Sequence, residues 1–128
     1  MDVIYSYSRK DAISDGVLID ITKTANEAGI ILPTAITDTA WSDCVEWDES
    51  DSDRKQVPQD TDGRLWDVVS MAYYAIRNAK ERSSILFSLY RVPRYGKART
   101  AQKVSLKIVI GPGDNGEPVL TIMMPGED

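Results

Sequence analysis

The sequence predicts an α+β fold, with a short N-terminal strand and helices, then one longer amphipathic helix packed on an antiparallel three- or four-stranded sheet with a C-terminal meander. Apolar residues recur at helical spacing from Leu65 to Ala79. Directly afterwards the apolar period shortens to that of a strand, over residues 85–92 and again over 103–110. A chain of 128 residues, 42% of them hydrophobic, is expected to form a single domain, residues 1–128.

The N-terminal quarter of the chain is expected to contain short elements. Residues 3–7 alternate in the manner of a strand, and Ser8 and Asp11 have the spacing of a helix capping box. Residues 17–21 form a brief apolar run that is typical of a buried strand.

The middle of the chain carries weaker signals. A short helix is expected over residues 23–28, ended by Gly29, and extended chain over residues 30–33. Thr37 or Asp38 is expected to cap a third helix. Residues 48–63 are polar and acidic, so we expect an exposed loop.

The C-terminal half carries the clearest signals. Asp62 is the expected N-cap of the long helix. Strands are predicted over residues 85–92, 103–110 and 119–124, and residues 111–116 are expected to join the last two as a hairpin because they contain Asn-Gly.

Several function classes are excluded by composition. The chain has no histidine, which removes histidine general bases, the usual nucleophilic triads and most zinc sites. Its one cysteine, Cys44, has acidic neighbours and is expected to be a buried structural residue. No catalytic residue, metal site or cofactor is predicted. The absence of a disulfide set, a signal-like N-terminus and a long apolar run predicts a cytoplasmic protein that does not enter a membrane.

Charge is distributed unevenly along the chain. The net charge is −5, yet residues 77–107 contain nine basic residues and one acid, whereas residues 1–76 contain 15 acids and six bases. Such a division orients a protein toward a charged partner, unless the two halves face each other in the fold. Both readings remain open from the sequence.

The strongest candidate binding site is the basic loop expected between the first two strands of the meander. Arginine and lysine pair with phosphates, and a tyrosine among them stacks on bases. The candidate site residues are Arg91, Arg94, Tyr95, Lys97 and Arg99. The alternative is a solvated loop whose charge protects a sheet edge.

Two kinds of partner follow from this charge pattern. The 91–99 loop is expected to meet nucleic acid or an acidic protein surface, and Lys103 and Lys107 share one face of the next strand and extend the patch. The acidic segment, residues 38–53, is expected to meet a basic protein instead. The oligomeric state is not predicted.

The chain contains four distinctive short motifs, at residues 4–9 (IYSYSR), 63–67 (GRLWD), 89–93 (LYRVP) and 113–119 (GDNGEPV). Through these motifs it resembles a family of small, functionally uncharacterised proteins of bacteria, plasmids and phages, and the resemblance extends over nearly the whole chain. It implies an origin on or near mobile DNA, and it supplies no catalytic residue. The function predicted from the charge pattern is a small binding or accessory protein that recognises a macromolecule through a charged surface.

A competing interpretation is an enzyme that uses a nucleotide without histidine. An aromatic strand and short helix followed by residues 15–18 (DGVL) is similar to the start of ADP-ribosyltransferase folds. That similarity implies Tyr5, Tyr7 or Arg9 near the nucleotide, with Glu117 as the only acid placed to serve as the late glutamate.

Overall fold

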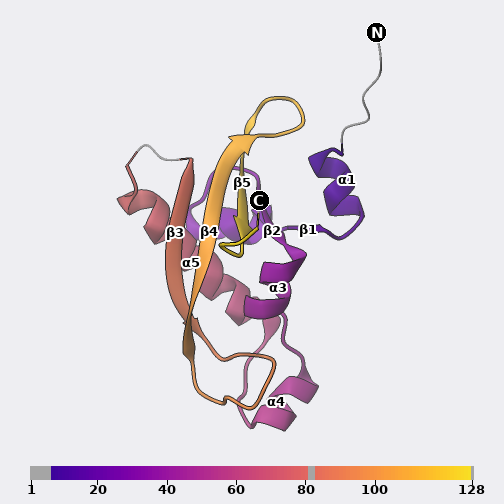
Figure 1. The fold of residues 1–128 in the computed structure, drawn as a ribbon, viewed down its shortest axis with the longest axis vertical. Coiled ribbons are helices and arrows are strands. Elements are labelled where there is room, and N and C mark those ends of the chain that lie inside the picture. The colour runs from indigo at the N-terminus through magenta and orange to yellow at the C-terminus, as the bar shows by residue number, and fades with distance from the viewer. Residues whose placement is uncertain (1–6, 81–82, 128) are drawn as a thin grey trace.

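The computed structural model describes residues 7–80 and 83–127, which form five helices and five strands (Figure 1). The helices are α1 (Arg9–Ser14), α2 (Thr22–Ala28), α3 (Asp38–Cys44), α4 (Glu49–Lys55) and α5 (Thr61–Asn78). The strands are β1 (Leu18–Asp20), β2 (Thr34–Thr37), β3 (Ser84–Arg91), β4 (Gln102–Pro112) and β5 (Pro118–Met123).

The predicted α+β class is confirmed, with a sheet that is larger than expected and mixed. The five strands lie in the order β1-β2-β5-β4-β3. All neighbours are antiparallel except β2 and β5, which run parallel with Ala35 opposite Thr121. The expected sheet of three or four antiparallel strands is therefore extended by β1 and β2. β1 lies within the strand predicted over residues 17–21, whereas β2 follows the extended chain predicted over residues 30–33 and was not predicted as a strand.

The C-terminal meander is confirmed. β3 pairs with β4 along all eight residues of β3, and β4 pairs with β5 from Lys107 to Pro112. Gly116 has a φ of 81°, and its N–H donates to the Gly113 carbonyl oxygen, which closes the hairpin between the last two strands.

The long helix is confirmed as α5, although its N-cap is not the predicted residue. The Asp60 side chain accepts a hydrogen bond from the Gly63 N–H, whereas Asp62 lies within the first turn. Asp62 still suits that position, because an acid stabilises the N-terminal end of a helix. The buried face carries Leu65, Val69 and Ala72, as the spacing predicted.

The expected exposed loop over residues 48–63 is wrong in part, because it contains α4. Asp48 and Asp51 form a reciprocal capping box at the start of this helix. Gln56 then ends it in a left-handed conformation, with a φ of 57°. The sequence has no apolar stripe here, since the helix packs through Asp51 and Lys55, both of which are buried.

The other short helices follow local signals. The Ser8–Asp11 capping box at α1 and the Thr37 cap of α3 are confirmed, and Gly29 ends α2 in a left-handed conformation. The strand predicted at residues 3–7 falls almost entirely outside the described residues. Among the described helices, none has the length and apolar character required to cross a membrane.

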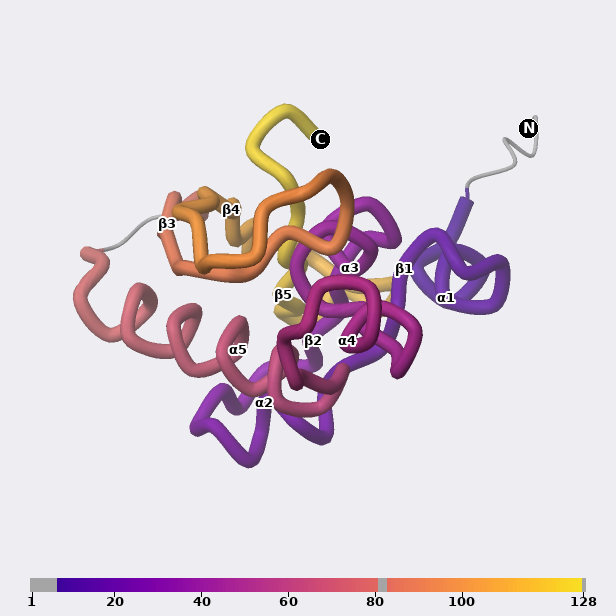
Figure 2. The backbone as a smooth tube through the Cα atoms, turned by 90° about the horizontal axis from the view of Figure 1, so that it is seen from below, coloured from indigo at the N-terminus to yellow at the C-terminus, as the bar shows by residue number. Residues whose placement is uncertain are grey.

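The sheet has two different faces. On one face, α2 and α5 lie together beneath the sheet (Figure 2), and Phe87, Leu89, Leu106 and Ile108 pack into a core shared with α5. On the other face, Arg9 of α1 reaches β5, where its guanidinium donates to the Thr121 hydroxyl and the Leu120 carbonyl oxygen. That cover does not extend to β3 and β4, which lie in the foreground of Figure 1 with α5 behind them.

We predict that Gly29→Ala destabilises the fold by about 2–4 kcal/mol. Gly29 has a φ of 111°, and an added Cβ would lie 2.7 Å from Cε1 of Tyr73 in α5. Gly16→Ala is the matched control, because Gly16 has a φ of 77° with open space around it, and should cost about 1 kcal/mol. Urea denaturation measures both, and equal losses would exclude the contact with Tyr73 as the cause.

Candidate functional site

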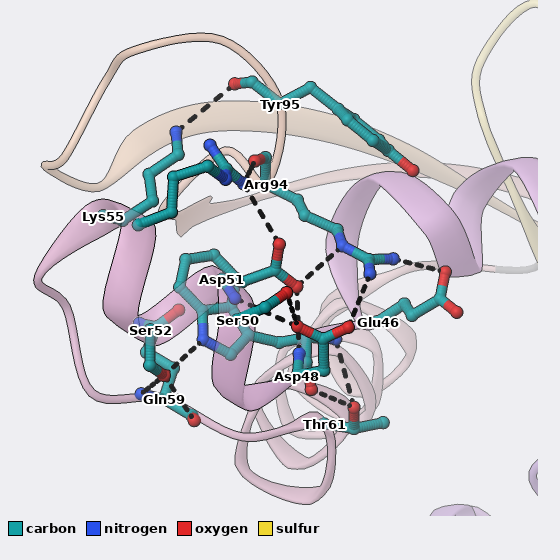
Figure 3. Close-up of polar contacts among 12 residues, drawn as sticks. Glu46, Asp48, Ser50, Asp51, Ser52, Lys55, Gln59, Thr61, Arg94 and Tyr95 are labelled. Atoms are coloured by element: carbon teal, nitrogen blue, oxygen red, sulfur yellow. Dashed lines mark hydrogen bonds and ion pairs between the residues drawn. The ribbon is translucent and has the colours of Figure 1, made fainter.

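The predicted basic loop lies directly against the acidic segment of the chain. The Arg94 guanidinium forms three ion pairs, at 2.6 Å to Glu46, 3.3 Å to Asp48 and 2.8 Å to Asp51 (Figure 3). The Asp51 side chain is buried, while those of Glu46 and Asp48 are exposed. Arg94 is therefore a structural residue that joins the loop to α4.

Helix α4 also holds the backbone of the loop. Arg54 donates to the Arg94 carbonyl oxygen at 2.7 Å, and Lys55 Nζ donates to the Ala98 carbonyl oxygen at 2.6 Å. Lys55 is only 2% exposed. In return, Arg99 Nε donates to the carbonyl oxygen of Lys55 at 2.8 Å. The loop conformation is therefore fixed by side chains that lie about 40 residues away along the chain.

The start of the loop is anchored by two more arginines. Arg91 forms a 3.0 Å ion pair with Asp43 of α3. Arg64 of α5 is 4% exposed and donates to the carbonyl oxygens of Val45 and Val92. Burial lowers the pKa of the Arg64 guanidinium. Arg64 therefore ties α5 to both the end of α3 and the first residue of the loop.

The electrostatics of Asp51 and Arg94 show that the contact is mutual. Burial alone would raise the pKa of Asp51, but the Asp48 N–H, Arg54 and Arg94 together lower it. Burial alone would lower the pKa of Arg94, but Asp51 and Glu46 raise it. Each group thus favours the charged state of the other. The alternative in which the acidic and basic parts of the chain face each other in the fold therefore holds for this loop and α4.

The five predicted site residues consequently divide into two groups. Arg91 and Arg94 are paired with acids of residues 43–51. Tyr95, Lys97 and Arg99 are exposed. Tyr95 lies next to Asp38 and Asp43 in a shallow pocket against α3, which is an unfavourable place for a phosphate.

The acidic segment, residues 38–53, is partly neutralised, as the basic loop at residues 91–99 is. Asp43, Glu46, Asp48 and Asp51 are engaged by Arg91 and Arg94. The exposed acids that remain outside these ion pairs are Asp38, Glu49 and Asp53. This is a smaller acidic surface than the sequence suggested for a basic protein partner.

A different basic surface lies on the uncovered face of β3 and β4, which we call the open sheet face. It consists of Leu86, Ser88, Tyr90, Lys103, Ser105 and Lys107. Tyr90 is paired with Lys103, and Leu86 with Lys107, so each apolar side chain has a lysine as its cross-strand neighbour. Leu86 and Tyr90 are both 67% exposed.

Part of this face was recognisable in the sequence. Lys103 and Lys107 were predicted to share one face of their strand, and the register confirms it. Leu86 and Ser88 were missed as site residues. The signal was available, because strand alternation places Leu86, Ser88 and Tyr90 on one side and the buried Phe87 and Leu89 on the other.

No acid interrupts this surface along the chain. Residues 83–113 contain six basic residues and neither aspartate nor glutamate. Lys107 is half-buried, and its Nζ donates to the carbonyl oxygen of Glu127, so the C-terminal residues reach this end of the face. The described ion pairs give Lys107 no carboxylate partner. The open sheet face thus combines positive charge, an aromatic ring and hydroxyl groups.

The residues of the enzyme interpretation have structural partners. Arg9 is bonded to β5, the Tyr7 hydroxyl donates to Asp15 at 2.7 Å, and the Glu117 carboxylate accepts from the Asn115 N–H in the hairpin. Tyr5 lies outside the described residues. Within residues 7–80 and 83–127, no three metal-ligating side chains gather to hold an ion.

These features define a small α+β protein with an internally neutralised loop and an exposed basic sheet face. The chain belongs to a family of unknown function, DUF6573, whose model matches residues 1–128. No curated protein and no solved structure matches the chain.

We predict that Arg94→Gln lowers the free energy of unfolding by about 2 kcal/mol, because among the described ion pairs it leaves the buried Asp51 carboxylate with Arg54 alone. Lys97→Gln in the same loop removes the same charge from an exposed side chain and should leave stability unchanged. Chemical denaturation of both variants measures the difference. If Lys97→Gln destabilises as much as Arg94→Gln, net charge and not the ion pairs holds the loop.

We also predict that the thiol of Cys44 is unreactive in the folded protein. Cys44 is 1% exposed, and burial together with Asp43 raises its pKa to about 12. Since the thiolate is the reactive form, a disulfide reagent at about pH 8 should modify Cys44 only after denaturation. Rapid modification of the native protein would contradict this burial.

Proposed function

We propose that this protein is a non-enzymatic binding protein that recognises single-stranded nucleic acid on its open sheet face. The observation that carries the proposal is the exposed ring of Tyr90, paired across the strands with Lys103. An aromatic ring on a sheet surface stacks on an unpaired base, and a neighbouring lysine contacts the phosphate that follows.

The position of these side chains on a sheet surface favours a single strand over a duplex. The side chains of neighbouring strands stand on a surface where spacing between strands is about 4.8 Å, so bases splayed from a single strand can lie across it. Leu86 supplies apolar contact, and Ser88 and Ser105 supply hydroxyl groups that donate or accept hydrogen bonds. A duplex keeps its bases stacked inside and offers Tyr90 nothing to stack on.

The charge of the face supports the proposal in spite of the net charge of −5. The loop that follows β3 adds the exposed Lys97 and Arg99 to Lys103 and Lys107. Four acids near this loop, Asp43, Glu46, Asp48 and Asp51, are paired with Arg91 and Arg94 instead of with these four cations. The chain as a whole is acidic, with a pI of about 4.7. The affinity for nucleic acid should therefore be modest, and salt should weaken it strongly.

The resemblance to plasmid and phage proteins agrees with such an activity, since mobile DNA passes through single-stranded intermediates. In this proposal Lys97, Arg99, Lys103 and Lys107 contact phosphates, and Tyr90 replaces Tyr95 as the stacking residue. An acidic protein surface would use the same lysines, but it has no base for Tyr90 to stack on. The two partners are therefore distinguished by the contribution of the ring.

We predict that Tyr90→Ala weakens binding of a labelled single-stranded oligonucleotide of ~12 nucleotides by about 10-fold or more. Lys103→Gln should weaken binding and reduce the slope of log Kd against log salt by about 0.7, as expected for one lost phosphate contact. Fluorescence anisotropy at low salt measures both variants. Circular dichroism establishes that they fold, because both side chains are exposed.

The matched control is Lys23→Gln, which removes the same charge from α2 on the opposite side of the sheet (Figure 2). It should leave both Kd and the salt slope unchanged. Loss of affinity in Lys103→Gln with no effect of Tyr90→Ala would favour an acidic partner over nucleic acid. If all three variants bind the oligonucleotide with the same Kd and salt slope as the parent, the open sheet face is not the binding site.

A further inference from the structure

The two edges of the sheet are protected very differently. β1 is three residues long, ends in Asp20 and is contacted by α1. β3 is eight residues long and has no charged residue, proline or glycine from Ser84 to Tyr90. Soluble monomers normally shield an edge strand by shortness, charge, proline or a covering element. β3 has none of these over most of its length.

The outer backbone groups of β3 can be assigned from its register. The Ile110 N–H donates to the Ser83 carbonyl oxygen, so this is a hydrogen-bonded pair of the antiparallel ladder. Such pairs alternate along a ladder, which directs the N–H and C=O groups of Ser84, Leu86, Ser88 and Tyr90 away from β4. Among the described residues, no strand lies beyond β3 to accept them.

The flank of α5 beside this edge carries exposed apolar side chains. Two shallow grooves lie between α5 and β3, one lined by Trp66, Met71 and Leu89 and the other by Ala75 and Ile85. Tyr74 is also exposed on this helix. The edge of the sheet and the helix beside it thus form one continuous surface that combines unpaired backbone groups with apolar side chains.

We propose that this surface binds a second copy of the chain, with β3 pairing antiparallel to β3 of the second copy about a two-fold axis at Ser88. Outward-directed residues must pair with outward-directed residues, and this register satisfies that condition. It places Leu86 opposite Tyr90 of the second copy on the open sheet face. On the core side it places Phe87 opposite Leu89 of the second copy.

The charges of α5 favour a second copy over an unrelated peptide. The N-terminal half of α5 carries Asp62 and Asp67, and Arg77 and Lys80 lie at its C-terminal end. A two-fold axis sets the two helices antiparallel on the same face of the joined sheet, so the acidic end of each lies toward the basic end of the other. The surface is therefore complementary to itself in hydrogen bonding, apolar character and charge.

This inference does not depend on nucleic-acid binding, although it would extend that activity. Pairing of the two β3 strands creates a ten-stranded sheet from the five strands of each copy. The open sheet faces of the two copies then lie side by side, with Lys103 and Lys107 of both copies flanking the paired edges.

The first test compares Ser88→Lys with Ser105→Lys. The two serines are cross-strand neighbours on the same face, with hydroxyl oxygens 3.2 Å apart, but only Ser88 lies on the edge strand. Sedimentation equilibrium of the parent at micromolar concentration should give twice the chain mass of 14.2 kDa. Ser88→Lys, which brings two ammonium groups together at the axis, should be monomeric. Ser105→Lys should remain dimeric.

The second test is a disulfide across the axis. A hydrogen-bonded antiparallel pair has a Cα separation of about 5.5 Å, which lies within the range that a disulfide spans. Ser88→Cys should therefore form a covalent dimer under mild oxidation, while Ser105→Cys should not. The native Cys44 does not interfere, because it is buried.

The dimer proposal is overturned if the parent is monomeric throughout, or if the folded Ser88→Lys variant stays dimeric and Ser88→Cys does not crosslink. Neither result affects the proposed function, which is tested by Tyr90→Ala and Lys103→Gln through oligonucleotide binding. Conversely, a dimer that binds no oligonucleotide supports the edge pairing and rejects the nucleic-acid partner.

Discussion

The Arg94 guanidinium lies among three carboxylates, and this contact fixes the relation between α4 and the loop after β3 (Figure 3). Much of the lower part of the molecule in Figure 1 depends on it, because α4 has no apolar face of its own. Breaking a buried ion pair is costly even where forming it adds little stability. The cluster therefore specifies one arrangement of two polar segments that hydrophobic burial alone would not position.

The same cluster determines which charges remain available to a partner. An acidic first half and a basic stretch along the chain do not become two opposite surfaces in space. They meet at the loop, where Arg91 and Arg94 are paired with acids, whereas the described ion pairs include neither lysine of the open sheet face. Some of the acids and bases that are segregated along the sequence thus neutralise each other in the fold. The charges that remain unpaired are identified only from the ion pairs of the structure.

The sequence predicted the elements whose signal is local and periodic. α5 and the three strands of the meander each repeat an apolar pattern over many residues, and the caps at Ser8, Thr37 and Gly29 depend on neighbours within a few positions. β2 is four residues long and lies parallel to a strand more than 80 residues away, so no local pattern defines it. The pairing of β2 with β5 therefore could not be deduced from the sequence alone.

The candidate site was predictable to a similar extent. Strand alternation indicated the lysines of β4, because that rule is local. The pairing of Arg94 with Asp51 joins positions separated by 43 residues, and α4 forms where its Lys55 meets carbonyl oxygens of a distant loop. These interactions arise from the tertiary structure, and a segment without apolar periodicity therefore predicts a loop where α4 forms.

The position of β5 in the sheet has a consequence for biosynthesis. β5 follows the other four described strands along the chain, yet it lies third of the five in the sheet and joins the β1–β2 pair to the β3–β4 pair. Until it emerges from the ribosome, the two pairs have no hydrogen-bonded connection, and the apolar face of α5 covers an incomplete sheet. Non-local pairing of this kind forms late. The segments made before β5 therefore keep apolar surface exposed until that strand docks, and surface of this kind makes a folding chain prone to aggregate.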